Sequence, residues 1–308
     1  MGILVVGTVA FDSVKTPEGE ANDAIGGSAT YFSAAASFYA PVDVIAVVGN
    51  DFPMASLDFL RERQVDVSGL EVKEGKTFRW AGEYAANMND RRTIDTQLNV
   101  FSGFKPVLAE RHRAHDHVFL ANLDPDVQRD VLTQSCRTDH RGRPDDPGIV
   151  ACDTMDFWIE GQKTSLLSTL SAVDVLIIND SEALQLVDDH NLVRAAERIL
   201  DLGPRAVVVK RGAHGATLCT RDAWFGIPSY PVANVVDPTG AGDTFAGGFM
   251  GYLARSGDTG VSALKRAMVH GSVMASFNVE DFSVRRLESL TEAEISDRHD
   301  RFMEMITP

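Results

Sequence analysis

Short apolar runs alternate with stretches of helical periodicity along most of this 308-residue chain. The runs are residues 3–7, 42–48, 117–120, 148–152, 173–178 and 206–209, and each is typical of a strand buried on both faces of a parallel sheet. Helical spacing falls between or after them, at 28–39, 54–63, 127–135, 158–170, 182–188, 192–202, 243–255 and 261–277. This alternation predicts an α/β fold with a doubly wound, mostly parallel sheet flanked by helices. Ligands then belong at the carboxyl ends of the strands.

One region departs from this rhythm. Residues 77–84 and 93–100 alternate apolar and polar side chains, and the turn-rich segment 87–90 joins them. The pattern predicts a separate, small antiparallel sheet inserted at about 70–101, and a surface hairpin without function is the alternative. No further module is required, so residues 1–308 are interpreted as a single domain with this insertion.

Charge and cysteine content exclude some classes of function. The formal net charge of −15 argues against a nucleic-acid partner, because a phosphate backbone demands concentrated Lys and Arg. Cys136, Cys152 and Cys219 are odd in number and widely spaced, which favours a reduced cytoplasm over a disulfide framework. The apolar start lacks a basic region or cleavage site, and no run approaches the ~20 residues that span a bilayer. We therefore expect a cytoplasmic protein with no membrane partner.

The most specific chemistry lies in residues 236–249. Pro238 ends a strand-like run, and Gly240 and Gly242 allow a sharp turn before a helix that opens near Asp243. Free amides and the positive end of the helix dipole would face an anion there. A carboxylate at this place could accept a proton from a hydroxyl that attacks a phosphoryl group, although an ordinary first-turn acid is the simpler alternative.

The segment Asp237-Pro238-Thr239-Gly240-Ala241-Gly242-Asp243-Thr244-Phe245 resembles the C-terminal signature of the ribokinase-like, or phosphofructokinase-B type, carbohydrate kinases. The resemblance extends through most of the chain. It implies that Asp243 is the catalytic base and that the amides of Gly240, Ala241 and Gly242 form the hole for the transferred phosphate. It also implies a monovalent-cation site, for K⁺, bordered by Asp237 and Thr239.

The resemblance also implies an acceptor site near the N-terminus. Gly26 and Gly27, before a small-residue helix, resemble the N-terminal signature of the family, and Asp12 follows the first strand where the family holds its substrate. Asp153 takes the place of an Asp-x-Asn element. Two residues differ from the family pattern, since Tyr31 and Met155 stand where Asn is common. These differences point away from simply naming ribose as the acceptor.

Two further segments match the nucleotide side of the family. Asn179 and Glu182 have the Asn-x-x-Glu spacing that orders Mg²⁺ and its waters, with Glu182 acting through water, although a helix cap alone would explain the pair. Gly212 and Gly215 match a Gly-x-x-Gly turn beside the nucleotide, where Lys210 could meet phosphate charge.

These observations favour an ATP- and Mg²⁺-dependent kinase that phosphorylates a hydroxyl of a small sugar, polyol or sugar-like molecule. A nucleoside kinase of the same fold is the alternative, and a non-catalytic sensor of nucleotide or sugar is the alternative from another class. A phosphatase or nucleotide hydrolase is a third class. The resemblance also implies that the inserted sheet closes as a lid over the acceptor, and this sheet could mediate a homodimer.

Overall fold

The computed structural model describes residues 2–135 and 148–307, so Cys136 lies outside the described residues. Within these ranges a nine-stranded sheet forms the centre of the molecule. In spatial order its strands are β13 (Trp224–Ile227), β12 (Ala216–Thr220), β11 (Ala206–Lys210), β10 (Val175–Asn179), β9 (Ile149–Cys152), β8 (His117–Leu120), β1 (Ile3–Val6), β4 (Val42–Gly49) and β5 (Val65–Lys73).

Neighbouring strands from β5 through β11 pair in parallel, whereas β12 and β13 add an antiparallel edge. All six predicted strands are present, and the α/β fold class is confirmed. The strands β5, β12 and β13 were missed, because they lie toward the edges of the sheet and mix polar with apolar residues. Residues 70–73, expected to open the insertion, instead end β5 and pair with β4.

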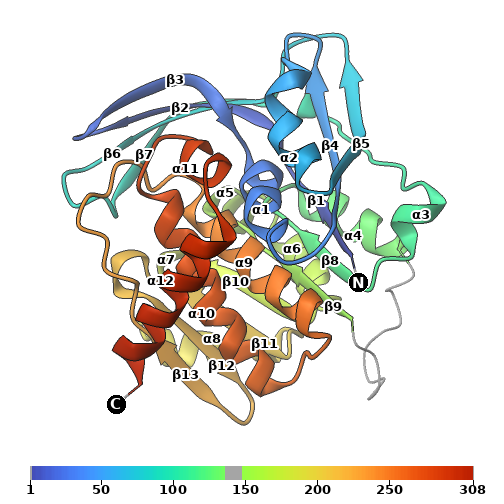
Figure 1. Cartoon of the computed structure of the whole chain (residues 1–308). Helices are drawn as coiled ribbons and strands as arrows, with labels where there is room; N and C mark the ends of the chain where they lie inside the picture. Colours follow the sequence, from blue (N-terminus) through green and yellow to red (C-terminus); the bar gives the residue numbers. More distant parts are fainter. Residues whose placement is uncertain (1, 136–147, 308) are drawn as a thin grey trace.

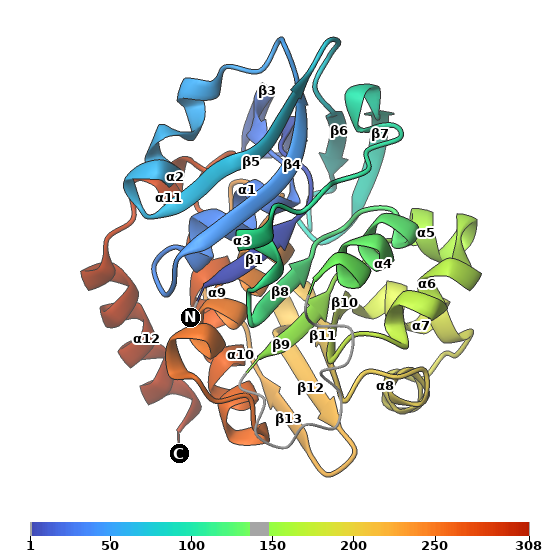
Figure 2. The same ribbon diagram turned by 90° about the vertical axis from the view of Figure 1, so that its right-hand side faces the viewer.

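Helices cover both faces of this sheet, as Figure 2 shows. One face carries α1 (Ser28–Ala36), α2 (Asp58–Glu62), α9 (Ala241–Ser256), α10 (Val261–Asn278), α11 (Arg285–Glu288) and α12 (Glu292–Ile306). The other carries α4 (Pro125–Gln134), α5 (Asp156–Gly161), α6 (Lys163–Leu170), α7 (Asp180–Val187) and α8 (Leu192–Asp201). A short helix, α3 (Glu110–Arg113), precedes β8. Each face therefore has its own hydrophobic core, with side chains of β1 alternating between the two.

A second sheet stands apart from the first, at the upper left of Figure 1. Its strand order is β3 (Gly19–Gly26), β2 (Ala10–Thr16), β6 (Arg79–Tyr84) and β7 (Arg91–Gln97). We call these four strands the lid. The hairpins β2–β3 and β6–β7 are antiparallel, as expected of this sheet, but β2 and β6 join them in parallel. The sequence indicated only the second hairpin and placed Asp12 a few residues after the first strand, and Asp12 lies in β2.

No helix in residues 2–135 or 148–307 is long and apolar enough to cross a membrane.

Candidate active site

The N-terminus of α9 carries the residues of the 237–245 motif. Gly240 has φ 74°, a left-handed conformation that suits glycine, and the helix starts at Ala241. Asp243 lies in the first turn and is partly buried. The amide of Ala241 donates to the carbonyl of Pro238 (3.1 Å), so it is used within the turn. The structure therefore differs from the expectation of three free amides, and an anion hole here depends on the amides of Gly240 and Gly242.

A cavity of about 1260 Å³ opens at this helix terminus. It lies at the carboxyl ends of β9, β10 and β11, which is where a doubly wound sheet binds its ligands. Ten of the residues singled out from the sequence line it: Asp153, Asn179, Glu182, Lys210, Gly212, Gly215, Gly240, Ala241, Gly242 and Asp243. The catalytic and nucleotide-side candidates are thus brought together in one cavity.

Lys210 lies beside the glycine turn. Its Nζ is 3.2 Å from a carboxylate oxygen of Asp153, and a Cβ at Gly242 would lie only 2.8 Å from the same Nζ. Burial lowers the pKa of Lys210, but Asp153, Glu182 and Asp243 outweigh this effect and raise it. The ammonium group is therefore charged and adjacent to the expected place of the phosphate.

Burial raises the pKa of Asp243 to about 7, with a further increase from the charge of Asp153 and a decrease from Lys210. A carboxyl group that titrates near neutral pH is suited to accept a proton and to release it again. An ordinary solvated acid in a first helical turn would not show this shift. The electrostatics of the turn therefore favour a chemical role for Asp243.

Asn179 and Glu182 form a capping box at the start of α7. The side chain of Asn179 accepts from the amide of Glu182 (2.7 Å), and the carboxylate of Glu182 accepts from the amide of Asn179 (3.2 Å). Glu182 is nevertheless buried at the cavity wall, and burial raises its pKa to about 7. A buried carboxylate that faces a cavity fits a role in holding the waters of Mg²⁺, so the structural and the functional interpretations are compatible.

The acceptor-side candidates Asp12, Gly26 and Gly27 do not line this cavity. Asp12 is buried, and its carboxylate accepts from the amide of Gly27 at 3.4 Å. Burial raises the pKa of Asp12 to about 7, and the charges of Asp237 and Asp243 raise it further, so the three carboxylates share one region. The ring of Tyr31 packs behind Gly240, where a Cβ would meet it at 2.4 Å.

Asp237 and Thr239 are buried on the lid side of the turn. The carboxylate of Asp237 accepts from the amides of Thr239 (2.8 Å) and Ser283 (3.4 Å). Its pKa is raised, mainly by burial. Asp237 has no salt bridge with any residue in the described part of the chain, and such a carboxylate fits a monovalent cation.

Sequence analysis missed the lid residues that reach this site. Tyr84 of β6 accepts from the hydroxyl of Thr239 (3.3 Å), and the side chain of Asn89 accepts from the amide of Ala213 (3.2 Å). Tyr84, Asn89 and Arg91 all line the cavity. The lid therefore contacts the turn at Gly212–Gly215 as well as the motif at α9. The turn-rich composition of residues 87–90 indicated the tip of a hairpin. No local pattern indicated that this tip contacts Ala213.

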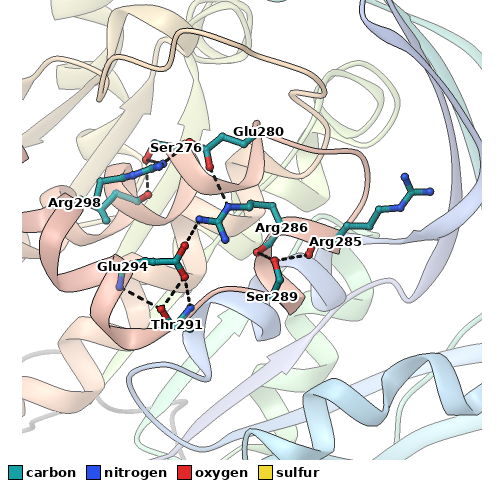
Figure 3. Close-up of polar contacts among 9 residues, drawn as sticks. Ser276, Glu280, Arg285, Arg286, Ser289, Thr291, Glu294 and Arg298 are labelled. Carbon is teal, nitrogen blue, oxygen red and sulfur yellow. Dashed lines mark hydrogen bonds and ion pairs between the residues drawn. The ribbon is translucent and has the colours of Figure 1, made fainter.

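Polar contacts join the C-terminal helices to the end of α10, as Figure 3 shows. Glu280 accepts from Arg286 (3.1 Å) and from Arg298 (2.6 Å), and Arg298 also donates to Ser276 (3.1 Å). The guanidinium of Arg298 lies 3.5 Å from the ring centroid of Phe277. Because Ser276 lines the cavity, these contacts fix the end of α10 where it borders the site.

Comparison with known proteins identifies the class. Over 280 residues the chain is 30% identical to an ATP-dependent ribose-1-phosphate kinase from Halopiger xanaduensis, covering 87% of this chain and 88% of that protein. Over 262 residues it is 26% identical to a cytidine kinase from Thermococcus kodakarensis, covering 83% and 89%. A putative ribokinase II from E. coli, solved in complex with ATP and Mg²⁺, shares the fold with a TM-score of 0.73, 21% identity and coverage of 97% and 99%.

These findings define a phosphotransferase that acts on a hydroxyl group. The chain belongs to the pfkB family of carbohydrate kinases, whose model matches residues 3–287. Within that family it is a sugar or nucleoside kinase.

Proposed function

We propose that this protein transfers the γ-phosphoryl group of ATP to a hydroxyl of a small sugar, polyol or sugar-like acceptor, with Asp243 as the base. The observation that carries this proposal is the position of Asp243 in the cavity, one residue after Gly242 and close to Lys210. Its carboxyl group, with a pKa near 7, can take the proton of the attacking hydroxyl at neutral pH.

Other residues of the cavity bind different parts of the triphosphate. The amides of Gly240 and Gly242 and the ammonium of Lys210 meet the charge that develops on the transferred group. The turn at Gly212–Gly215, with φ of 52° and 87° at its glycines, borders the nucleotide. Asn179 and Glu182 hold the waters of Mg²⁺, which neutralises phosphate charge when it is bound. Catalysis is then mainly positioning and charge stabilisation.

On the acceptor side, Asp12 accepts hydrogen bonds from hydroxyls of the acceptor, next to Gly26 and Gly27. Asp153 contributes to acceptor binding from the opposite side of the turn. Asp237 and Thr239 would hold K⁺, whose charge would support the anion-binding turn. The lid excludes water, which would otherwise compete with the acceptor for the phosphoryl group.

A nucleoside acceptor is the second candidate. It is supported by the similarity to the cytidine kinase and by the aromatic ring of Trp80 on the lid, which could stack on a base. The similarity to the ribose-1-phosphate kinase favours a sugar acceptor instead.

A screen of the purified protein decides between these functions. ADP formation from MgATP is measured with sugars, polyols, ribose 1-phosphate and nucleosides, each with the wild type and with Asp243→Asn. We expect acceptor-dependent ADP formation that the variant loses. Ligand binding without ADP formation would identify a sensor, and ADP formation without any acceptor would identify a hydrolase.

A further inference from the structure

The strand β7 places two consecutive arginines on opposite faces of the lid. In the register of β6 with β7, Arg91 lies across from Tyr84 and Arg92 lies across from Glu83. Arg92 forms an ion pair with Glu83 (2.8 Å), which also binds Lys15 (3.3 Å). Because side chains alternate along a strand, Arg91 faces the other way, and it lines the cavity together with Tyr84.

Two contacts fix the position of this face above the cavity. At one end the hydroxyl of Tyr84 accepts from the hydroxyl of Thr239, which directly precedes Gly240. At the other end the side chain of Asn89 accepts from the amide of Ala213. The tip of the lid fits closely, since a Cβ at Gly212 would lie 2.5 Å from the side-chain oxygen of Asn89. Arg91 lies two residues after Asn89 and seven after Tyr84, and so stands between the nucleotide turn and the α9 turn.

The charge of Arg91 acts on two carboxylates of the cavity. It lowers the pKa values of both Asp243 and Glu182, which are raised mainly by burial. Its guanidinium lies 5.5 Å from the ring centroid of Trp80, a contact that leaves its hydrogen-bond donors available. No carboxylate in the described ranges lies within ion-pair distance of Arg91, whereas Lys210 is already paired with Asp153. In the described part of the chain, a cation without a carboxylate partner therefore faces a cavity that is rich in carboxylates.

We propose that Arg91 is a catalytic residue carried by the lid, which contacts the transferred phosphoryl group and stabilises its charge in the transition state. This inference rests on the proposed function of the same cavity. A planar guanidinium can bind two phosphoryl oxygens at once, and it is worth most where the lid excludes water. Lid closure and phosphoryl transfer are then coupled, because the cation reaches the phosphate only when Tyr84 and Asn89 make their contacts.

The test compares Arg91→Gln with Arg92→Gln, since both remove one positive charge from the same strand. Binding of MgADP and of a non-hydrolysable MgATP analogue is measured by calorimetry, without any acceptor. We expect Arg91→Gln to weaken the analogue roughly tenfold or more, as for a hydrogen bond between charged groups, while leaving ADP nearly unchanged. Arg92→Gln should leave both affinities within about threefold of wild type, because exposed ion pairs contribute little.

Turnover supplies the second readout, with an acceptor that the screen identifies. Arg91→Gln should reduce kcat by roughly 10²–10³, with little change in the KM for the acceptor, whereas Arg91→Lys should restore part of the loss because it keeps the charge without the planar fork. Equal weakening of ADP and analogue, or a raised acceptor KM at unchanged kcat, would overturn the proposal. If Arg91→Gln weakens binding of the ATP analogue but not of ADP, and the wild type transfers no phosphate to any acceptor, the Arg91 contact would be supported and the proposed function overturned.

Discussion

The rim of the cavity and the lid above it are built in different ways. The rim consists of residues that directly follow strand ends or open a helix, such as Asp153 after β9, Lys210 at the end of β11 and Asp243 in α9. The lid joins two hairpins, residues 10–26 and 79–97, through a parallel pairing of β2 with β6. The functional residues of the rim are therefore positioned by short segments of sequence, whereas those of the lid are positioned by tertiary contacts. Substitutions at the rim should affect phosphoryl transfer itself, whereas those at the lid should affect the acceptor and closure, with Arg91 as the lid residue that also acts on the transferred phosphoryl group.

The largest effect is expected at the rim, from Asp243→Asn. Removing a positioned base should reduce turnover by roughly 10²–10⁴, while the affinity for ATP stays nearly unchanged. Steady-state kinetics and calorimetry measure the two quantities. Asp222→Asn, in the exposed turn between β12 and β13, is the matched control and should behave like the wild type. Near wild-type turnover in Asp243→Asn would show that Asp243 is not the catalytic base.

Asp12→Ala tests the lid side. If this carboxylate binds acceptor hydroxyls, kcat/KM for the acceptor should fall by an amount worth about 1.5–3 kcal/mol, and the dissociation constant for ATP should not change. Glu20→Ala, on the exposed part of β3, is the control. A loss confined to ATP binding would place Asp12 with the rim and remove the contrast between the two regions.

Gly242→Val tests the anion-binding turn. The new side chain would displace Lys210, whose Nζ lies 2.8 Å from the Cβ position, and would crowd the amide that faces the phosphate. Affinity for a non-hydrolysable ATP analogue should fall roughly tenfold, as for one hydrogen bond to a charged group. Gly226→Val is the control, because a Cβ there meets open space. Equal affinities in the two variants would place the phosphate elsewhere.

The pH dependence of kcat/KM should report the coupled carboxylates of the rim and the lid. Asp243 must be ionised to accept a proton, and its pKa is raised to about 7, so activity should fall as the pH drops through this value. Asp12 and Glu182 titrate in the same range, so the acidic limb of the pH profile belongs to the coupled carboxyl groups of Asp12, Glu182 and Asp243. Arg91→Gln should shift the limb to higher pH, because Arg91 lowers the pKa of Asp243. Full activity at pH 5 would contradict this assignment.

The smallest expected effect is on backbone dynamics. Binding of acceptor should slow amide hydrogen exchange in residues 77–100, since a closed lid opens less often. The helix α8, on the outer face of the large sheet, should not change. Protection restricted to segments distant from the lid would show that closure is not linked to the acceptor.

The difference between rim and lid also explains how much the sequence could predict. The buried parallel strands and the glycine turn before Asp243 are local patterns, and the structure contains them where expected. Ala241 departs from the expectation, because whether an amide is free depends on where the carbonyl of Pro238 points.

The lid was predictable only in part. Alternation in residues 77–84 and 93–100 indicated one hairpin, but β2 and β3 carry polar residues on both sides and gave no clear signal. The contacts of Tyr84 and Asn89 join residues 155 and 124 positions apart in the chain, and no local pattern encodes such distances. The network around Glu280 was missed because no helix was expected after residue 277, although Thr291 and Glu294 form a capping box at the start of α12.

A crystal structure of Asp243→Asn with ATP and Mg²⁺ tests the central claim most directly, because the variant binds the nucleotide but should not turn it over. We expect the γ-phosphoryl oxygens to accept from the amides of Gly240 and Gly242, with Lys210 and the substituted side chain at position 243 beside them. A triphosphate that lies along Gly212–Gly215 but points its γ-phosphate away from the α9 turn would contradict the account.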